Sequence, residues 1–342
     1  MKSLVTGASG FVGSAVTRCL LAAGHEVRCL IRPECDQRNL DGLPVEMLEG
    51  DLRDIASLKR AVTNCENLFH VAADYRLWVP NPETMYDINV KGTQTLILAA
   101  TEAGIKRIIY TSSVATLGLN SDGSPANEET PSSLVEMTGH YKRSKFLAEQ
   151  VVQHFTNKHK LPLVIVNPTT PIGPRDIRPT PTGRIVVDTL RGRMPAYMNT
   201  GLNVAHVDDI AQGHLLAYMH GRPGERYILG GENINLLQIL QTIDEIGGKK
   251  INRINIPVTL IFPIAWMMEK IAIITNVEPR ASIDSIRMAK KKMFFSSEKA
   301  IRELGYQYRP STEAIKDAMI WFQNNGYCDG YVNSPTRKKF LA

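Results

Sequence analysis

Two short segments, far apart in the chain, hold residue types whose spacing suits redox chemistry on a small molecule. The first, Thr6–Gly13 (TGASGFVG), follows an apolar run at the N-terminus, and the second is Tyr141–Lys145 (YKRSK). The first predicts a cradle for nucleotide phosphates, and the second places a phenol and an ammonium group one helical turn apart. Together they indicate hydride transfer between a nicotinamide cofactor and a carbon that bears oxygen, although neither segment is specific alone.

The glycine segment has the spacing of a dinucleotide turn. Gly7, Gly10 and Gly13 allow a tight turn, close approach of the backbone to a pyrophosphate, and close packing of a helix on a strand. The helix that follows offers free amides and the positive end of its dipole to phosphates. The alternative is a simple strand-to-helix turn without a ligand.

The Tyr141/Lys145 pair predicts acid–base catalysis. A free tyrosine has a pKa of about 10, and we expect the neighbouring ammonium to lower that value. Tyr141 could then exchange a proton with the substrate oxygen while Lys145 reaches the nicotinamide ribose. Ser113, or less favourably Ser112, ends a strand at the same edge and could polarise that oxygen. An ordinary surface helix and a capped strand end are the alternative interpretations.

The end of the second strand favours NADP over NAD. An acidic residue there would accept from a free ribose hydroxyl, whereas an arginine favours a 2′-phosphate. This chain has Arg32 at that point, with Glu34 and Asp36 further on and Arg38 as a second cation. If the prediction is wrong, Arg32 is a solvated loop charge.

Two further polar residues could serve the cofactor or the fold. Asp51 follows a strand, where it could accept from the adenine amino group, and either Asp51 or Asp54 could cap the next helix. Asn89, in the middle of a helix, could bridge to backbone or to a water near the site, and a structural role is as plausible.

Alternating strands and helices must position these groups. The predicted strands are Lys2–Val5, Val27–Ile31, Val45–Glu49, Asn67–Ala72, Arg107–Thr111 and Leu163–Val166. The predicted helices are Gly13–Ala23, Ile55–Thr63, Met85–Ala103 and Tyr141–His159. This alternation is typical of an α/β protein with a doubly wound Rossmann parallel sheet.

The second half of the chain predicts a smaller C-terminal α/β substrate domain. We assign residues 1–167 to the Rossmann domain and residues 168–342 mainly to substrate binding, with about 203–222 returning to the Rossmann domain. Five prolines between Pro168 and Pro181 predict a long loop over the site. Thr170, Arg175, Arg184 and Tyr197 are candidates to face the substrate, and Asp208 is a candidate helix N-cap.

Composition and charge indicate which classes of ligand and partner this chain could bind. The net charge of +6 over 342 residues suits an anionic small molecule, and no nucleic-acid signature or metal-type histidine spacing is present. Five cysteines without a disulfide framework suggest a cytoplasmic protein. The apolar stretch 258–275, interrupted by Glu269 and Lys270, is more readily a buried or partner-facing helix than a membrane-surface helix. Helices flanking the sheet could form a homodimer.

Several segments taken together resemble the extended short-chain dehydrogenase/reductase superfamily. These are TGASGFVG, DLRD, NVKGT, TSSVATLG, YKRSK and NPTTPIGP, with a similar closing segment near the C-terminus. The segments RDIRPTPTGRIVVD, HVDD and MAKKKMFFSS are similar to the hopanoid-associated sugar epimerase group, which neighbours the dihydroflavonol-reductase-like enzymes. Sugar-nucleotide epimerases usually carry Asp where this chain has Arg32, and this difference favours an exchangeable NADPH.

The resemblance implies a catalytic triad of Ser113, Tyr141 and Lys145. The expected cofactor contacts are Gly7, Ser9, Gly10, Phe11, Val12, Gly13, Arg32, Asp51, Leu52, Ala72, Ala73, Asn89, Tyr141, Lys145 and Pro168. The leading hypothesis is an NADP-dependent oxidoreductase or epimerase acting at a secondary alcohol or ketone, on a sugar nucleotide or a hydroxy/keto small molecule. The alternatives are a cofactor-sensing protein without turnover and a membrane-associated dehydrogenase of lipid or steroid type.

Overall fold

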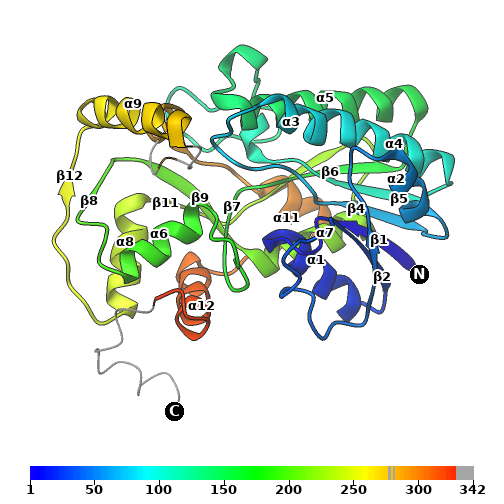
Figure 1. Ribbon diagram of the computed structural model, residues 1–342, viewed down its shortest axis with the longest axis horizontal. Coiled ribbons are helices and arrows are strands. Elements are labelled where there is room, and N and C mark those ends of the chain that lie inside the picture. Colours follow the sequence, from blue (N-terminus) through cyan, green and yellow to red (C-terminus); the bar gives the residue numbers. More distant parts are fainter. Residues whose placement is uncertain (276–278, 280–281, 329–342) are drawn as a thin grey trace.

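A seven-stranded parallel sheet forms the centre of the computed structural model, which describes residues 1–275, 279 and 282–328 (Figure 1). The strand order is β10-β6-β5-β4-β1-β2-β3. The strands are β1 (Lys2–Thr6), β2 (Glu26–Ile31), β3 (Val45–Glu49), β4 (Asn67–His70), β5 (Arg107–Thr111), β6 (Leu163–Pro168) and β10 (Arg226–Leu229). The predicted doubly wound Rossmann sheet is confirmed.

Helices cover both faces of this sheet, so successive strand residues enter different cores. Leu4 packs with residues of α2 (Ile55–Val62), α4 (Thr93–Glu102) and α5 (Gly139–His159). Its neighbour Val5 packs with residues of α1 (Phe11–Ala22), α7 (Val207–His220) and α11 (Glu298–Leu304). Burial on both faces explains why adjacent residues in the middle of these strands, such as Leu4 and Val5 or Leu68 and Phe69, are both apolar.

A smaller unit packs beside the carboxyl ends of the strands. Its sheet has the order β11-β9-β13, from Glu232–Asn235, Gly201–His206 and Lys292–Met293, and β7 (Thr170–Ile172) also pairs with β9. Helices α6 (Pro181–Leu190), α8 (Leu236–Ile246) and α12 (Ser311–Asn324) share an apolar core with it. Strands β8 (Ala196–Tyr197) and β12 (Ile254–Asn255) form a separate pair, and α9 (Val258–Thr275) and α10 (Ile283–Ala289) follow.

Three local predictions need correction. The proline-rich segment is not one loop, because Thr170–Ile172 forms β7 and Pro181 begins α6, where a proline is tolerated in the first turn. The strand Arg226–Leu229 pairs with β6 in the large sheet rather than lying in the smaller unit. The helix predicted over residues 85–103 is divided into α3 (Glu83–Tyr86), a π-helical turn (Asp87–Gly92) and α4.

Candidate active site

The glycine turn connects β1 to α1 in a conformation that demands glycine at two positions. Gly7 has φ +71°, and a Cβ there would lie 2.8 Å from the backbone of Ala72 at the end of β4. A Cβ on Gly13 would lie 2.0 Å from the carbonyl oxygen of Gly7. Gly10 is the N-cap of α1 and has no side chain, so the free amides in the first turn of α1 stay available to a ligand. This turn fits the pyrophosphate of a dinucleotide.

The other expected cofactor contacts surround this turn at the carboxyl edge of the sheet. Phe11 and Val12 lie in the first turn of α1, and Pro168 ends β6. Ala72 and Ala73 follow β4, where the amide of Ala72 donates to the hydroxyl of Thr6. Ser9 lies within the turn, and its carbonyl accepts from the side chain of Asn39 at 3.2 Å. Leu52 is buried against the position of Gly92.

Arg32 follows β2 as an exposed side chain, and two acidic groups near it, Asp36 and Asp51, are already paired. The Asp36 carboxylate binds Arg38 at 2.7 Å, which lowers the pKa of Asp36. Asp51 accepts from the amide and guanidinium of Arg53, and this hydrogen bonding, with a smaller effect of Arg32, lowers the pKa of Asp51. Arg38 is therefore engaged by its neighbour, while Arg32 stands exposed at the strand tip.

The sequence left open whether Asp51 or Asp54 caps the next helix and whether Asp51 contacts the adenine. The side chain of Asp54 accepts from the amide of Ala56 at 3.0 Å and caps α2. Asp51 does not cap the helix and remains at the edge of the sheet with Arg53.

Asn89 clamps two parts of the site region together. It is 2% exposed, and its Oδ1 accepts from the Asp74 amide at 2.7 Å. Its Nδ2 donates to the carbonyl of Asp74 at 2.9 Å and to the hydroxyl of Ser144 in α5 at 2.9 Å. These bonds tie the segment after β4 to the helix that carries Tyr141 and Lys145.

Lys145 is buried and fixed by strand β5. Its Nζ donates to the carbonyl of Thr111 at 2.9 Å and to the Tyr110 hydroxyl at 3.2 Å, and it lies 4.8 Å from the centre of the Tyr110 ring. Burial lowers the pKa of Lys145 to about 8, and the nearby Glu149 opposes this effect. The ammonium is thus held at one point below the carboxyl edge of the sheet.

Tyr141 and Ser113 come together across the gap between α5 and β5. Ser113 hydrogen-bonds to the Tyr141 phenol, which lowers the phenol's pKa, but burial raises that pKa by more. The expectation that Lys145 sets a lowered pKa for Tyr141 is therefore wrong for this structure. Ser113 also accepts from the amide of Ala115 at 3.1 Å and begins a 3₁₀ turn, so it caps the chain and faces the phenol at once.

A buried carboxylate that the sequence did not single out organises the floor of the site. Glu149 lies one helical turn after Lys145 and is 3% exposed. It accepts from the hydroxyl of Ser112, from Thr116 at 2.8 Å, from Asn167 at 3.0 Å and from Arg226 at 3.1 Å. Ser112 is consequently engaged below the site, which leaves Ser113 as the serine beside the phenol. The four-residue spacing from Lys145 on one helix was the available signal.

A pocket lies in this region, and its lining includes Val114 and Lys142, the sequence neighbours of Ser113 and Tyr141. Its cavity volume is about 80 Å³. Its walls come from the turn after β5, from residues 136–142 around the start of α5, and from residues 288–295, which run from the end of α10 past β13; they are Val114, Ala115, Leu117, Gly118, Leu119, Glu136, Met137, Thr138, Lys142, Met288, Lys291, Met293 and Phe295. Burial and the proximity of Lys291 lower the pKa of Lys142 to about 8. The Glu136 carboxylate, which accepts from the amide of Ser133, belongs to the same lining, so the pocket contains two lysines and one acidic side chain.

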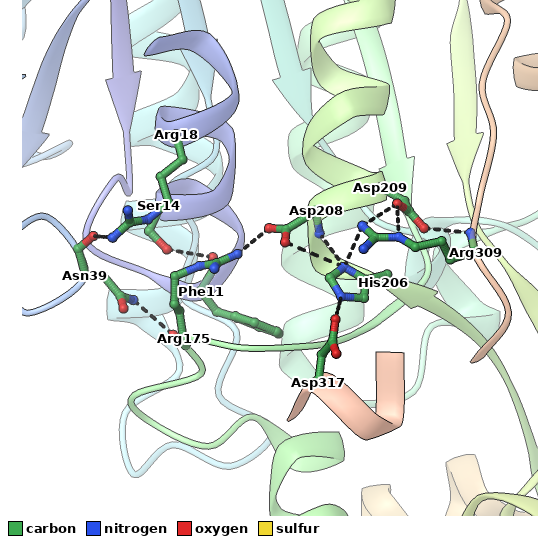
Figure 2. A network of polar contacts seen from close by, with 10 residues as sticks. All are labelled: Phe11, Ser14, Arg18, Asn39, Arg175, His206, Asp208, Asp209, Arg309 and Asp317. Atoms are coloured by element: carbon green, nitrogen blue, oxygen red, sulfur yellow. Dashed lines mark hydrogen bonds and ion pairs between the residues drawn. The ribbon is translucent and has the colours of Figure 1, made fainter. Parts of the chain in front are cut away.

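Arg175 lies elsewhere, in a polar network that joins α1 to the smaller unit (Figure 2). Its guanidinium pairs with Asp208 at the start of α7, and its carbonyl accepts from Asn39. Arg175 was expected to face the substrate, but it has φ +75° and points toward α1 and α7. Arg184 likewise donates to the carbonyl of Pro179.

The start of α7 also differs from the prediction. His206, not Asp208, is the cap, because its Nδ1 accepts from the Asp208 amide at 3.0 Å and from Arg309 at 3.2 Å. Its Nε2 therefore carries the proton and donates to Asp317 at 3.2 Å, as Figure 2 shows.

Comparison with known proteins identifies the family. The sequence profile described as the NAD dependent epimerase/dehydratase family matches residues 3–230. The chain belongs to this family. The named relatives are reductases, epimerases and dehydratases, so the chain is an enzyme of the extended short-chain dehydrogenase/reductase type. The glycine turn described above suits the nicotinamide cofactor that the family binds.

Relatives within and near the family carry several activity names. A Synechocystis sp. protein named "Putative dihydroflavonol 4-reductase" is 43% identical over 94% of this chain and 95% of its own length. "Sterol demethylase protein B" of Methylococcus capsulatus is 36% identical over 95% of this chain and 99% of its own length. The crystal structure of gox2253 is 51% identical, with a TM-score of 0.86 over 95% of this chain and 98% of that one.

The structural features of the family extend to more distant proteins. A nucleoside-diphosphate-sugar epimerase from Pseudomonas aeruginosa superposes with a TM-score of 0.77 at 26% identity, over 96% of this chain and 99% of that one. The fold is typical of soluble enzymes. Within the described residues, α9 is long and apolar enough to cross a membrane by length and composition, and no group of three His, Cys, Asp or Glu side chains is arranged to hold a metal ion.

Proposed function

We propose that this family member is an NADPH-dependent reductase of a ketone or aldehyde carbonyl, with Tyr141 as the acid. The observation that carries the proposal is the approach of the Ser113 hydroxyl to the Tyr141 phenol, on the helix that also carries the buried ammonium of Lys145. A pocket lined by their sequence neighbours Val114 and Lys142 lies in the same region. A phenol that faces a second hydroxyl in this way can share the oxygen of one bound carbonyl with it.

The protonation states favour reduction. Burial raises the pKa of Tyr141, so the phenol holds its proton at neutral pH and can donate it to an oxygen that becomes an alkoxide. Ser113 donates to the same oxygen and stabilises its developing charge. Lys145, with a pKa of about 8, is mostly charged at pH 7 and lies one helical turn after Tyr141, where its ammonium can bind the ribose hydroxyls of the nicotinamide. When bound on the glycine turn, the cofactor supplies the hydride.

The preference for NADPH rests on the charges at the end of β2. Arg32 is exposed there, while Asp36 is engaged by Arg38 and Asp51 by Arg53. A ribose 2′-phosphate placed beside Arg32 would gain an ion pair, whereas a free 2′-hydroxyl would find those two carboxylates occupied.

The names of the relatives support carbonyl reduction over epimerisation. Besides the reductase named above, a Stigmatella aurantiaca relative, 30% identical over 93% of this chain, is named as a ketoreductase acting on a farnesylated quinoline oxide. A reductase consumes NADPH stoichiometrically with product, whereas an epimerase shows no net consumption. NADPH oxidation measured with a panel of cyclic ketones, dihydroflavonols included, distinguishes the two.

The variant Tyr141→Phe tests the acid role. We expect turnover to fall by a factor of 10² to 10⁴ with little change in NADPH affinity, because the phenol acts on the substrate oxygen. Tyr308→Phe, at an exposed tyrosine outside the site, is the control. Full turnover by Tyr141→Phe would refute the assignment, and binding of NADPH without turnover by the native protein would favour a cofactor sensor.

The variant Arg32→Asp tests the cofactor preference. The ratio of kcat/KM for NADPH to that for NADH should fall by at least tenfold, since the change replaces an attraction for the 2′-phosphate by a repulsion. Arg302→Asp, at an exposed arginine of α11, should leave the ratio unchanged. An unchanged ratio for Arg32→Asp would mean that Arg32 does not meet the 2′-phosphate.

A further inference from the structure

Helix α9 presents an apolar surface that the rest of the described protein does not cover. Within α9, all of which the structure describes, Ala265 and Ala272 are the buried residues. Large apolar side chains stand exposed around the opposite face: Leu260, Ile264, Trp266, Met267, Ile271, Ile273 and Ile274, the last of them 83% exposed. In Figure 1 the helix lies at the upper left of the molecule, away from the seven-stranded sheet. A continuous apolar patch of this kind marks a docking surface.

The outward residues follow helical spacing. Leu260, Ile264, Met267, Ile271 and Ile274 recur every three or four positions, which places them on one side of the helix. An 18-residue window of α9 has a mean hydropathy of 1.6 with 11% of it buried. The helix therefore has an inner side that packs on the protein through small residues and an outer side made of large apolar ones.

Basic side chains border this apolar surface. Lys270 lies 5.7 Å from the centre of the Trp266 ring, and Lys290 lies 4.8 Å from the centre of the Phe262 ring. Lys290 begins the exposed run Lys290–Lys292, which follows α10, and α10 packs against α9. We call Lys270 and Lys290–Lys292 the basic rim. The acid of α9, Glu269, turns inward, where it accepts from the amide of Ile283 at 2.7 Å.

We propose that α9 and its basic rim dock the protein on the surface of an anionic phospholipid bilayer, with the helix lying in the plane of the interface. A helix that pairs an apolar face with tryptophan and lysines at its border has the character of an interfacial helix. The charge on the rim is complementary to anionic headgroups. The inner face of α9 packs on the protein and carries Glu269, so the helix lies along the membrane rather than across it.

A second copy of the chain fits this surface less well. A two-fold pairing through α9 would bring the basic rim of each copy toward that of the other, and like charges across an interface oppose association. A bilayer with anionic lipid satisfies both the apolar side chains and the lysines.

The docked orientation places the pocket near the lipid. The stretch 288–293, from the end of α10 to β13, lines the pocket through Met288, Lys291 and Met293. The same segment contributes to the basic rim. Docking would therefore bring the pocket close to the headgroups of the bilayer.

Vesicle co-sedimentation of the full-length protein tests the docking. Vesicles with 30 mol% phosphatidylglycerol in phosphatidylcholine should bind the protein, and vesicles of phosphatidylcholine alone should bind it at least tenfold more weakly. The triple variant Ile264→Gln/Met267→Gln/Ile271→Gln should lose at least tenfold in binding. The double variant Lys290→Gln/Lys292→Gln should lose about 25-fold on the anionic vesicles, since each lysine near a charged bilayer contributes about fivefold.

A matched control removes exposed apolar residues elsewhere. Leu98→Gln/Met219→Gln/Ile301→Gln changes three exposed side chains outside α9 and should bind as the native protein does. NADPH affinity is measured separately for each variant. Because cofactor binding does not depend on docking, an unchanged affinity shows that the variant is folded. Absence of binding to anionic vesicles, or full binding by the α9 triple variant, would overturn the proposal. So would a dimer that the α9 variant abolishes without any vesicle binding, or binding that resists high salt and alkaline carbonate as a spanning helix does.

Discussion

Replacement of Glu149 by glutamine perturbs the floor of the site without changing its shape. One carboxylate oxygen accepts from Ser112, Thr116 and Asn167, and the other accepts from Arg226. A glutamine offers one oxygen and one NH₂ group. Whichever way the amide is turned, its NH₂ meets a donor, either the guanidinium of Arg226 or the amide of Asn167. At least one buried hydrogen bond is lost, and the positive charge of Arg226 loses its carboxylate.

The expected cost is large for a change of one atom type. Removal of one partner from a buried ion pair costs about 3 kcal/mol, which would lower the thermal midpoint by roughly 4 °C. Glu149 also opposes the effect of burial on Lys145, whose pKa is about 8. Loss of the negative charge lowers that pKa further, so the ammonium loses its proton at a lower pH. The decline of kcat at alkaline pH should begin at lower pH in Glu149→Gln than in the native enzyme.

Two measurements check this reasoning, with Glu102→Gln as the control. Glu102 pairs with Lys59 on the surface, where an ion pair contributes up to about 1 kcal/mol. Thermal unfolding at pH 7 should separate the two variants, and the pH dependence of kcat should move in Glu149→Gln alone. Equal thermal midpoints for the two variants, together with an unshifted alkaline decline, would show that Glu149 neither stabilises the floor nor acts on Lys145.

Three other outcomes follow from the geometry. Gly13→Ala should weaken NADPH binding and cost about 1–3 kcal/mol of stability, because its Cβ would lie 2.0 Å from a backbone oxygen, whereas Gly24→Ala has no such neighbour and should spare NADPH binding. In the native enzyme, kcat for reduction should fall as the pH rises through about 8, where Lys145 loses its proton, and a flat profile from pH 7 to 9.5 would contradict this role. Asn89→Ala should cost about 2 kcal/mol and accelerate hydrogen exchange at the Asp74 amide, and an unchanged exchange rate would refute the clamp.

Local patterns predict the strands of the large sheet well. The six predicted strands lie within two residues of those observed, because each is a short run with an apolar centre bounded by turn residues. Ser113 and Tyr141 come together because the turn after a strand and a helix of a parallel sheet face the same edge, while the catalytic roles of Ser113, Tyr141 and Lys145 stay predictions.

Features that depend on contacts between distant segments could not be predicted in the same way. β7 exists through pairing of Thr170–Ile172 with β9, and prolines in the segment conceal it. The Glu149 network needs Asn167 and Arg226 from two other strands. The direction of the Tyr141 pKa shift is set by burial of the phenol, which depends on tertiary packing. The ammonium of Lys145 is instead bound to the Thr111 carbonyl and the Tyr110 hydroxyl of β5.

Strand β5 has a consequence for how substrate range could change in this family. Its last residue, Thr111, lies two positions before Ser113, and through the Thr111 carbonyl and the Tyr110 hydroxyl the strand fixes Lys145, while the outer wall of the pocket comes from residues 288–293. In the proposed reductase, the groups for proton transfer and the residues of this wall therefore lie in separate stretches of the chain. Exchange of the 288–293 stretch between relatives offers a route to new substrates that leaves the acid–base geometry as β5 sets it.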